Sequence, residues 1–447
     1  MNLNLSMFRS NDIRTPSSRL TDELALRLAR AEACYMRDVL NVDGVVLAHD
    51  ARASGPRMIE IAAHAYTAAG LDCVVLPGPT GVCQFYYAAM RHPDLAGVFI
   101  GASHNPAGDT GRKLVGPWVT PIARGIGAEG GLARIEELYR LGASGSARRQ
   151  GSITAFDAAQ GYVTFSIRLA QLLPGDLKAV RILHDYLHGA GGPELMLGFS
   201  TAEACLTPLH FSPDPSFPVG DPNPVKQDVI ARGLAELSTG RYDLAMFFDG
   251  DADRLDVYLA DGTLLASSFV YAAVLPLILK RMTSPRHADL SPLSSAIEPS
   301  RPVVFVDTKS NPLAIAEMQR AGAEIRLIRS GHSHIKHAML SDGAAIGTVE
   351  ESAHFYESFV LEGRRFCTEN TLYFALMIAR AFKESPERFA RLAAVQASTG
   401  RMREWGYVFP DDARRAAALE AVRAHFTSSG AELVTTMSDG TELDDDH

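Results

Sequence analysis

Short apolar runs alternate with longer amphipathic runs along most of this 447-residue sequence. The first series has β-rich runs at 45–47, 73–76 and 97–100, with a helical run at 57–69 between the first two. This alternation is typical of βαβ units built around a mainly parallel sheet. We therefore predict an α/β fold with mixed, mainly parallel sheets.

The alternation continues after a Gly/Ser/Arg-rich stretch at 142–151, which we interpret as a linker. The fully apolar run at 244–248 predicts a buried central strand. A Pro/Ser-rich segment near 285–302 predicts a surface loop, because clustered prolines interrupt both helices and strands. Further strands are expected at 180–183, 303–306, 325–328, 344–347 and 432–436, and helices at 269–282, 370–382 and 411–426. This pattern predicts three consecutive α/β domains at 1–148, 152–258 and 259–388, followed by residues 398–447, which are too few for a fourth core of similar size.

Charge and composition narrow the classes of function. The formal net charge is −9 and is not gathered in long blocks, so we expect no nucleic-acid partner. The five cysteines are scattered without a C-x-x-C spacing, which suggests reduced thiols rather than disulfides or structural zinc. The N-terminus has no leader pattern, and the longest apolar stretch, 269–279, is short and contains Pro276. We expect a cytoplasmic protein without a membrane partner.

A polar segment, Gly101-Ala102-Ser103-His104-Asn105-Pro106, follows directly after an expected buried strand. Loops at this position face ligands in α/β proteins. A serine hydrolase elbow would need glycine two residues after Ser103, where Asn105 stands, so acyl transfer is disfavoured. An ordinary turn remains an alternative, since Ser, Asn and Pro all favour turns.

Three aspartates, Asp249, Asp251 and Asp253, stand at alternate positions directly after the apolar run. Such carboxylates can converge on one hard cation, and magnesium keeps further positions for water and phosphate oxygens. A calcium-binding EF-hand loop starting at Asp249 would need glycine at its sixth position, where Arg254 stands. Without a cation the carboxylates would repel one another. We predict a magnesium site, in a loop that Gly250 allows to curl.

Two further polar segments follow expected strands. Lys309 and the segment 331–336, which contains His332, offer basic and titratable groups suited to a phosphorylated ligand, although a lone histidine is often structural. The segment 350–354 carries acids and a hydroxyl that could hold sugar hydroxyls. It could equally open an ordinary helix with glutamate in the first turn.

Taken in this order, the segments resemble the α-D-phosphohexomutase superfamily, which includes phosphomannomutases and phosphoglucomutases. Residues 8–14 are similar to the opening motif of that family, and 101–113 to its phosphoserine loop. Residues 249–254 are similar to its metal loop, and His332 lies in a match to its third-domain Gly-His segment. Residues 350–354 are similar to its sugar-binding loop. The resemblance implies four domains around a central cleft, so residues 398–447 would form a partial fourth α+β domain.

The resemblance also implies a mechanism. Ser103 would carry a phosphoryl group at rest, and its oxygen would join the three aspartates around Mg²⁺. The phosphoserine would donate to a sugar monophosphate, and the resulting hexose 1,6-bisphosphate, which also acts as an activator, would turn round and return its other phosphate to Ser103. The implied catalytic residues are Ser103, His104, Lys113 and His332; the metal ligands are Ser103, Asp249, Asp251 and Asp253; the residues expected to bind substrate are Arg9, Arg254, Lys309, Glu350, Ser352 and His354.

The sequence departs from the family pattern at several positions. Thr110-Gly111 replaces the usual Asn-Gly, Ala48-His49-Asp50 replaces Gly-Arg-Asp, and Ala353 replaces glycine in the sugar loop. The fourth-domain phosphate loop, an Arg-x-Ser-Asn-Thr-x-Pro type segment, has no match in the sequence. Each charge-assisted hydrogen bond to phosphate is worth about 1.5–3 kcal/mol, so a chain without this loop would hold its substrate more weakly.

The sequence therefore leaves two hypotheses for the function. The first is a hexose phosphomutase acting on mannose or glucose phosphates, which the intact Ser103 and the three aspartates favour. The second is a truncated, non-catalytic homologue that binds sugar phosphate or a protein partner, which the unmatched phosphate loop favours. The sequence indicates neither the preferred epimer nor the oligomeric state.

Overall fold

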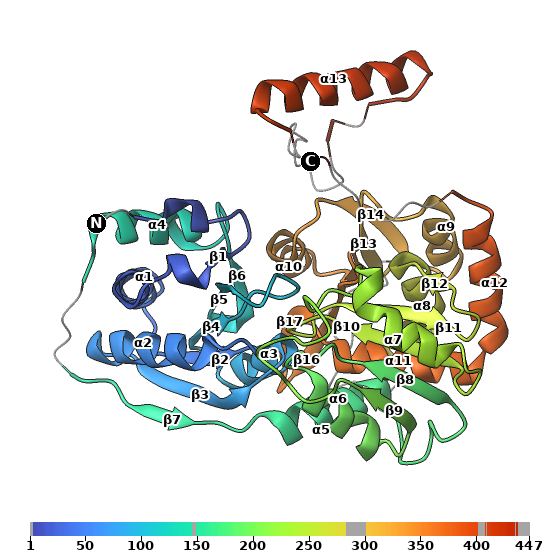
Figure 1. The fold of residues 1–447 in the computed structure, drawn as a ribbon, viewed down its shortest axis with the longest axis horizontal. Coiled ribbons are helices and arrows are strands. Elements are labelled where there is room, and N and C mark those ends of the chain that lie inside the picture. Colours follow the sequence, from blue (N-terminus) through green and yellow to red (C-terminus); the bar gives the residue numbers. More distant parts are fainter. Residues whose placement is uncertain are drawn as a thin grey trace.

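The computed structural model describes residues 3–144, 149–282, 301–400, 407, 409–433 and 435–436. The described chain contains three separate β-sheets, each formed by a consecutive part of the sequence. Figure 1 shows the first sheet on one side of the molecule, and the second and third packed beside each other on the other side.

The first sheet has seven strands, in the order β1-β5-β4-β2-β3-β7, with β6 paired to β5. Its central strands β4, β2, β3 and β7 run parallel, and β5 and β1 continue it in antiparallel fashion. Every residue of β2 and β4 is buried, which explains why these runs are apolar without alternation. The strands are β1 (Ile13–Pro16), β2 (Gly44–His49), β3 (Asp72–Pro79), β4 (Ala96–Ile100), β5 (Asp109–Gly116), β6 (Thr120–Ile122) and β7 (Ile153–Ala155); the helices are α1 (Asp22–Cys34), α2 (Gly55–Ala68), α3 (Val82–Arg91) and α4 (Leu132–Leu141).

The second sheet has five strands in the order β12-β11-β10-β8-β9. Strands β10, β8 and β9 are parallel, and the β10–β11 hairpin reverses the chain. The predicted central strand, β10, is fully buried. The elements are α5 (Ala159–Ala170), β8 (Arg181–Asp185), α6 (Gly192–Thr201), β9 (Cys205–Leu209), α7 (Gln227–Leu237), β10 (Leu244–Phe248), β11 (Leu255–Leu259) and β12 (Leu264–Leu265).

The third sheet has the order β14-β13-β15-β16-β17, so that β14 lies at an edge. Strands β14, β13 and β15 are parallel, and β16 and β17 form an antiparallel hairpin. The elements are α8 (Ser267–Met282), β13 (Val303–Asp307), α9 (Pro312–Arg320), β14 (Glu324–Ile328), α10 (His332–Ser341), β15 (Ala345–Val349), β16 (Phe355–Leu361), β17 (Arg364–Glu369), α11 (Thr371–Glu384) and α12 (Pro386–Ala397).

One apolar core joins the three sheets. It includes Phe85 of α3, Phe248 of β10 and Phe374 of α11, all fully buried. The side-chain oxygen of Asn370 accepts hydrogen bonds from the backbone N–H of Tyr373, which caps α11, and from the hydroxyl of Tyr162 in α5 at 3.0 Å. These contacts hold the three units, and therefore their loops, in fixed positions relative to one another.

The last described helix, α13 (Asp412–Ser428), lies apart from the three sheets in Figure 1 and is largely exposed. In the predicted strand at 432–436, residue 434 lies outside the described residues and the other four form no named strand. No helix among the described residues is both long and apolar enough to cross a membrane.

The structure confirms the α/β fold with several mixed sheets, and it has the predicted strands at 45–47, 97–100, 244–248 and 303–306. Antiparallel pairs are more prominent than the alternation predicts, because hairpins follow β10 and β15. Strand β7 pairs with β3 in the first sheet, although the predicted second domain begins at 152. The domain limits stay a prediction. The predicted loop near 285–302 falls mostly outside the described residues, as does part of the linker at 142–151.

Candidate active site

Loops at the ends of strands from all three sheets meet around one pocket. The pocket has a volume of about 300 Å³ and lies where β4, β10, β14 and β15 end and where the loop before β1 passes. Crevices at the carboxyl ends of parallel strands are the usual ligand sites of α/β folds. The residues that line it are Arg9, Ser10, Asn11, Asp12, Arg14, Ser103, Lys113, Asp253, Arg254, Gly331, His332, Glu350, Ser352 and His354.

Ser103 lies at the centre of the loop after β4. Its φ is +49°, a left-handed conformation that non-glycine residues seldom adopt and that costs about 1–3 kcal/mol. The Ser103 hydroxyl donates a hydrogen bond to Asp249 Oδ2 at 2.7 Å and lies 3.2 Å from Nδ1 of His104. The loop thus places a hydroxyl between a carboxylate and an imidazole.

The three aspartates converge as the sequence predicts. One carboxylate oxygen from each of Asp249, Asp251 and Asp253 lies within 4.8 Å of the others, and all three side chains are buried. The Lys113 ammonium donates to Asp251 Oδ2 at 2.8 Å and to Asp253 Oδ2 at 2.5 Å. The Oδ1 atoms of Asp251 and Asp253 have no hydrogen-bond partner among the described residues. The three carboxylates offer oxygen ligands that lie close enough together to share one ion, and two of their oxygens are unpaired. These properties fit a magnesium ion.

Lys113 supplies the positive charge that the carboxylates need in this arrangement. Burial opposes a charged Lys113, but Asp251 and Asp253 outweigh it and raise the pKa of the ammonium. The pKa of Asp253 is lowered well below its usual value, because Lys113, His354 and Arg254 outweigh the cost of burial. Burial, together with the neighbouring aspartates, raises the pKa of Asp249. Lys113 therefore offsets part of the negative charge of the cluster.

The expectation that Gly250 lets the metal loop curl is wrong in its detail. The left-handed residue of this loop is Ala252, with φ +55°, and Gly250 has no positive φ. Gly250 is needed for space instead, because an added Cβ would lie 2.6 Å from the carbonyl oxygen of Ser103. The absence of a side chain at Gly250 thus lets the metal loop pack directly on the serine loop.

Three histidines around the pocket are held neutral. Burial, together with the positive charges of Arg254 and Arg14, lowers the pKa of His104 to about 2. Burial also lowers the pKa of His354 to about 3 and that of His332 well below its usual value. His104 lies next to the Ser103 hydroxyl, 3.2 Å from its oxygen, and is uncharged there.

The second and third units are linked directly in the site. Nε of Arg254 donates to Nε2 of His354 at 3.0 Å, and their backbones form an isolated β-bridge. Glu350 accepts hydrogen bonds from the Gly331 N–H at 2.9 Å and from the Tyr356 hydroxyl at 2.6 Å. Burial raises the pKa of Glu350 to about 7. The segment 350–354 is a turn between β15 and β16, so the alternative that it opens a helix is wrong.

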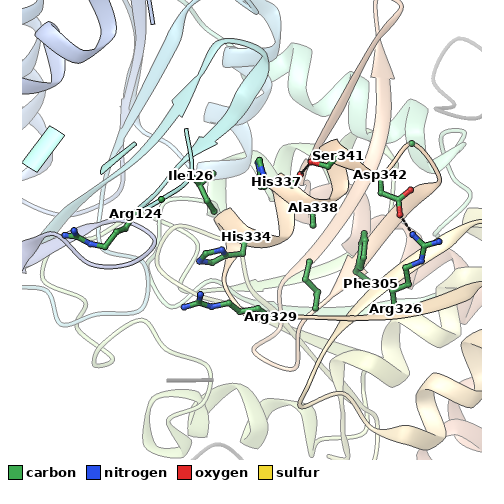
Figure 2. A pocket seen from close by; sticks show the side chains of 13 residues that line it. Arg124, Ile126, Phe305, Arg326, Arg329, His334, His337, Ala338, Ser341 and Asp342 are labelled. Carbon is green, nitrogen blue, oxygen red and sulfur yellow. Dashed lines mark hydrogen bonds and ion pairs between the residues drawn. The ribbon is translucent and has the colours of Figure 1, made fainter. Parts of the chain in front are cut away.

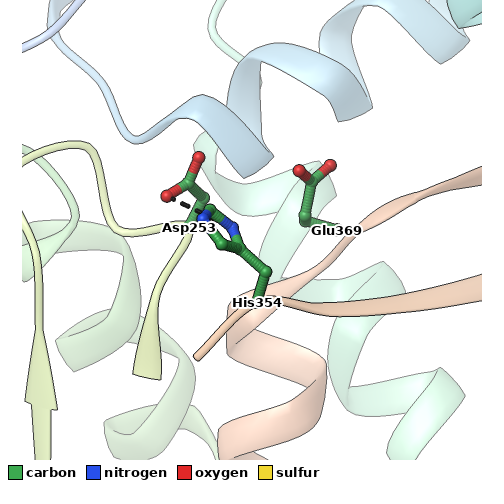
Figure 3. Close-up of side chains that lie close together, drawn as sticks. All are labelled: Asp253, His354 and Glu369. Carbon is green, nitrogen blue, oxygen red and sulfur yellow. Dashed lines mark ion pairs between the residues drawn. The ribbon is translucent and has the colours of Figure 1, made fainter. Parts of the chain in front are cut away.

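A second group of side chains looks like a metal site but does not fit one (Figure 3). Asp253, His354 and Glu369 are buried and close enough to share an ion. However, Arg254 donates to Nε2 of His354, so the neutral ring carries its proton on Nδ1, the atom that faces Asp253 at 3.6 Å. Glu369 is already paired with the Lys336 ammonium at 3.0 Å. His354 and Glu369 thus already have Arg254 and Lys336 as partners, which makes them poor candidates for cation ligands.

Among the predicted substrate residues, Arg9 and Ser352 line the pocket. Lys309 follows β13 at the same edge of the third sheet, is exposed, and is not among the residues that line the pocket. Three other predicted site residues, His104, Asp249 and Asp251, do not line the pocket either, but each contacts Ser103 or Lys113, which do.

Sequence reasoning missed one residue that shapes the site. Arg52 is 1% exposed, and its guanidinium donates to the carbonyl oxygens of Ser103 at 2.8 Å and Asn105 at 2.7 Å, and to that of Pro106. It is held by Asp50 at 2.9 Å. The sequence does contain one indication of this residue: an arginine stands two residues beyond the aspartate of Ala48-His49-Asp50.

Comparison with known proteins agrees with this arrangement. Residues 5–125 match domain I of the phosphoglucomutase/phosphomannomutase family, an alpha/beta/alpha domain, and residues 162–262 match domain II of the same family. The chain is 28% identical to a phosphoglucomutase of Neisseria gonorrhoeae over 354 residues, which is 78% of this chain and 70% of the relative. It is 25% identical over 449 residues to phosphohexose mutases of Xanthomonas campestris pv. campestris, covering 99% of this chain and 90% of the relative.

The fold agrees with that of a solved relative. A phosphoglucomutase/phosphomannomutase family protein from Burkholderia thailandensis superposes with a TM-score of 0.70 at 23% identity, over 88% of this chain and 80% of that one. Two family domains matched in their proper order, together with these relatives, define the class of the protein. Residues 5–125 and 162–262 belong to the phosphoglucomutase/phosphomannomutase family as its domains I and II, and the chain is similar over most of its length to proteins named phosphoglucomutase and phosphohexose mutase.

Proposed function

We propose that this protein is a phosphohexomutase that interconverts hexose 6-phosphate and hexose 1-phosphate, with mannose or glucose as the sugar. The observation that carries the proposal is the position of the Ser103 hydroxyl, 2.7 Å from Asp249 and beside a neutral His104. The named relatives support it, since they include phosphoglucomutases, phosphomannomutases and phosphohexose mutases.

In the proposed cycle, phospho-Ser103 gives its phosphoryl group to a hydroxyl of the bound sugar monophosphate. The bond between phosphorus and the serine oxygen breaks, a bond between phosphorus and the sugar oxygen forms, and the hydroxyl proton passes to a base. His104, beside the Ser103 hydroxyl, and Lys113, which lines the pocket, would handle the proton of the attacking or leaving hydroxyl. The bisphosphorylated sugar then turns round, and its other phosphoryl group returns to Ser103.

The charge of the transferring group also needs compensation. A Mg²⁺ ion held by Asp249, Asp251, Asp253 and the Ser103 oxygen would supply electrostatic stabilisation of that group. Arg254 lies beside these residues, with its Nε 3.7 Å from Asp249 Oδ2. Arg9, Glu350, Ser352 and His354 would hold the sugar phosphate, and Lys309 would need to approach from outside the pocket.

The decisive assay is conversion of glucose 1-phosphate and mannose 1-phosphate to their 6-phosphates, with Mg²⁺ and a trace of hexose 1,6-bisphosphate. We expect turnover by the folded protein, and intact-mass spectrometry should find one phosphoryl group on a fraction of molecules. Ser103→Ala should lose both signals, while Ser18→Ala, a change at an exposed serine, should keep them.

The same assay separates the second hypothesis, a non-catalytic homologue that binds sugar phosphate or a protein partner. Such a protein would bind glucose 6-phosphate in calorimetry but give no turnover and no phosphoryl mass on Ser103. Absence of turnover by well-folded protein would refute the mutase proposal. The three predicted domains at 1–148, 152–258 and 259–388 enter the proposal as the units that supply the serine, the aspartates and the sugar loop.

A further inference from the structure

A second and larger pocket lies along helix α10, whose first residue, His332, lines the candidate active site. It has a volume of about 780 Å³ and is bounded by α10, by the edge strand β14 and by the loop at residues 124–126 of the first unit. Figure 2 shows Arg124, His334 and Arg329 gathered at one end, and the ion pair between Arg326 and Asp342 at the other. The predicted function gives this pocket no role.

The pocket is basic. Three arginines, Arg124, Arg326 and Arg329, and two histidines line it, against one aspartate. Arg326 is already paired with Asp342 and with Glu324. Arg124 is paired with Glu136, but 44% of its side chain remains exposed. Arg329 makes no hydrogen bond or ion pair with the part of the chain that the structure describes, and it is partly buried. A partly buried guanidinium without a counter-ion favours an anion.

The rest of the lining suits an organic molecule. Phe305, Ile328, Ile126 and Ala338 form an apolar wall, and the volume falls in the range of about 300–1,000 Å³ that is usual for small-molecule sites. The forked guanidinium matches the oxygen geometry of phosphate, and each arginine can bind two oxygens at once. Together these features fit a ligand with a phosphate group at one end and an apolar or ring portion at the other.

We propose that this pocket is a second ligand site, separate from the cleft, that binds a phosphorylated small molecule through Arg124, Arg329 and His334. The phosphate group lies between Arg124 of the first unit and Arg329 and His334 of the third. The remainder of the ligand packs on Phe305 and Ile328. The proposal does not depend on the mutase reaction, because it rests on a different pocket.

The two pockets share walls, so a ligand here would act on the active site. Helix α10 carries His334 and His337 of the second pocket and begins with His332, which lines the first. The backbone N–H of Arg124 donates to the Ser10 carbonyl at 2.9 Å, and Ser10 lines the first pocket. An anion bridging the two units would fix the distance between the loop at 9–12 and the start of α10. It would therefore change the affinity for the sugar phosphate more than the rate of transfer.

The test is calorimetric titration of the whole chain with inorganic pyrophosphate in metal-free buffer, with and without saturating glucose 6-phosphate. We expect a class of bound pyrophosphate that glucose 6-phosphate does not displace. The double variant Arg329→Gln/His334→Gln should weaken this class by roughly tenfold or more, as expected for the loss of one charge-assisted contact. Arg19→Gln, a matched change at an exposed arginine outside both pockets, should leave it unchanged.

Two results would overturn the proposal. One is displacement of all bound pyrophosphate by glucose 6-phosphate, which would put the anion in the cleft. The other is an affinity in the double variant within twofold of the wild type. If the double variant fails to fold, Arg124→Gln tests the same class from the opposite wall. Because the readout is binding, failure of the mutase proposal would leave these outcomes unaffected.

Discussion

Replacing Arg52 by methionine should destabilise the protein and disorder the serine loop. The guanidinium is buried against Asp50 and against backbone carbonyls of the segment that follows Ser103, and it lies over the ring of Phe217 in the second unit, 5.5 Å from its centroid. Methionine keeps much of the volume but none of the donors. The change therefore isolates the polar contribution of Arg52.

The size of this destabilisation follows from the groups that lose Arg52 as their hydrogen-bond or ion-pair partner. Removing one member of a buried ion pair costs about 3–5 kcal/mol, because the other charge stays buried without compensation. The carbonyl oxygens of Ser103 and Asn105 lose their donor as well, although part of this cost is recovered where water reaches them. We expect the free energy of unfolding to fall by about 3–5 kcal/mol, a large part of the 5–15 kcal/mol usual for a domain.

Equilibrium urea unfolding measures the change, with the double variant Asp50→Asn/Arg52→Met as its partner. Because Asp50→Asn removes the orphaned charge, the double variant should lose less than the sum of the two single variants. Phosphorylation of Ser103 by hexose 1,6-bisphosphate should be impaired in Arg52→Met even under conditions where the protein is folded. Full stability in Arg52→Met, or strictly additive losses, would refute the role given to this arginine.

Three other changes test separate parts of the structure. Lys113→Met leaves the buried carboxylates of Asp251 and Asp253 without their ammonium, so the metal-free protein should lose about 3 kcal/mol of its free energy of unfolding. Mg²⁺ should then raise the thermal midpoint of the variant more than that of the wild type, and equal rises would contradict the pairing. Ala353 has a φ of +72°, which glycine adopts without strain, so Ala353→Gly should stabilise the protein by about 0.5–1 kcal/mol in urea unfolding. A lower free energy of unfolding in the variant would show that Ala353 is unstrained. Burial raises the pKa of Glu194 from 4.5 to about 8. Between these two pH values the folded state keeps a proton that the unfolded chain releases, so the free energy of unfolding should fall as the pH rises. Glu194→Gln should remove this slope, which is worth at most about 4 kcal/mol between pH 5 and pH 8, when unfolding at the two pH values is compared; an unchanged slope would place the titration elsewhere.

The sequence predicts the parts of the site that depend on local order. A buried strand followed by polar residues is visible in the chain itself, so the positions of Ser103, Asp249 and Glu350 at strand ends could be predicted. Their convergence was expected from the resemblance, since no spacing in one sequence fixes how three sheets pack. The structure brings these loops together because a single apolar core joins the units.

Contacts between units could not be predicted in the same way. Lys113 and Asp251 are 138 residues apart, and only the packing of the first sheet on the second brings them to 2.8 Å. The positive φ of Ala252 is a further example, because alanine gives no sign of a left-handed conformation, and the nearby glycine suggested the wrong position. Glycine signals both conformational freedom and close approach, and the sequence does not say which one applies at Gly250.

The pairing of Lys113 places a limit on how the proposed reaction can proceed. Asp251 and Asp253 take two of the three N–H donors of the Lys113 ammonium in the buried cluster, so at most one donor remains for a sugar hydroxyl. When a divalent cation neutralises the three carboxylates, the attraction that raises the pKa of Lys113 weakens, and burial, which opposes the charge, gains in relative weight. Lys113 would then both turn toward the pocket that it lines and give up a proton more readily. Occupation of the metal site would thereby convert a structural cation into an acid, which is the state that protonation of a leaving oxygen requires. The Lys113→Met variant separates the two roles, since Mg²⁺ can restore its charge balance but not its proton.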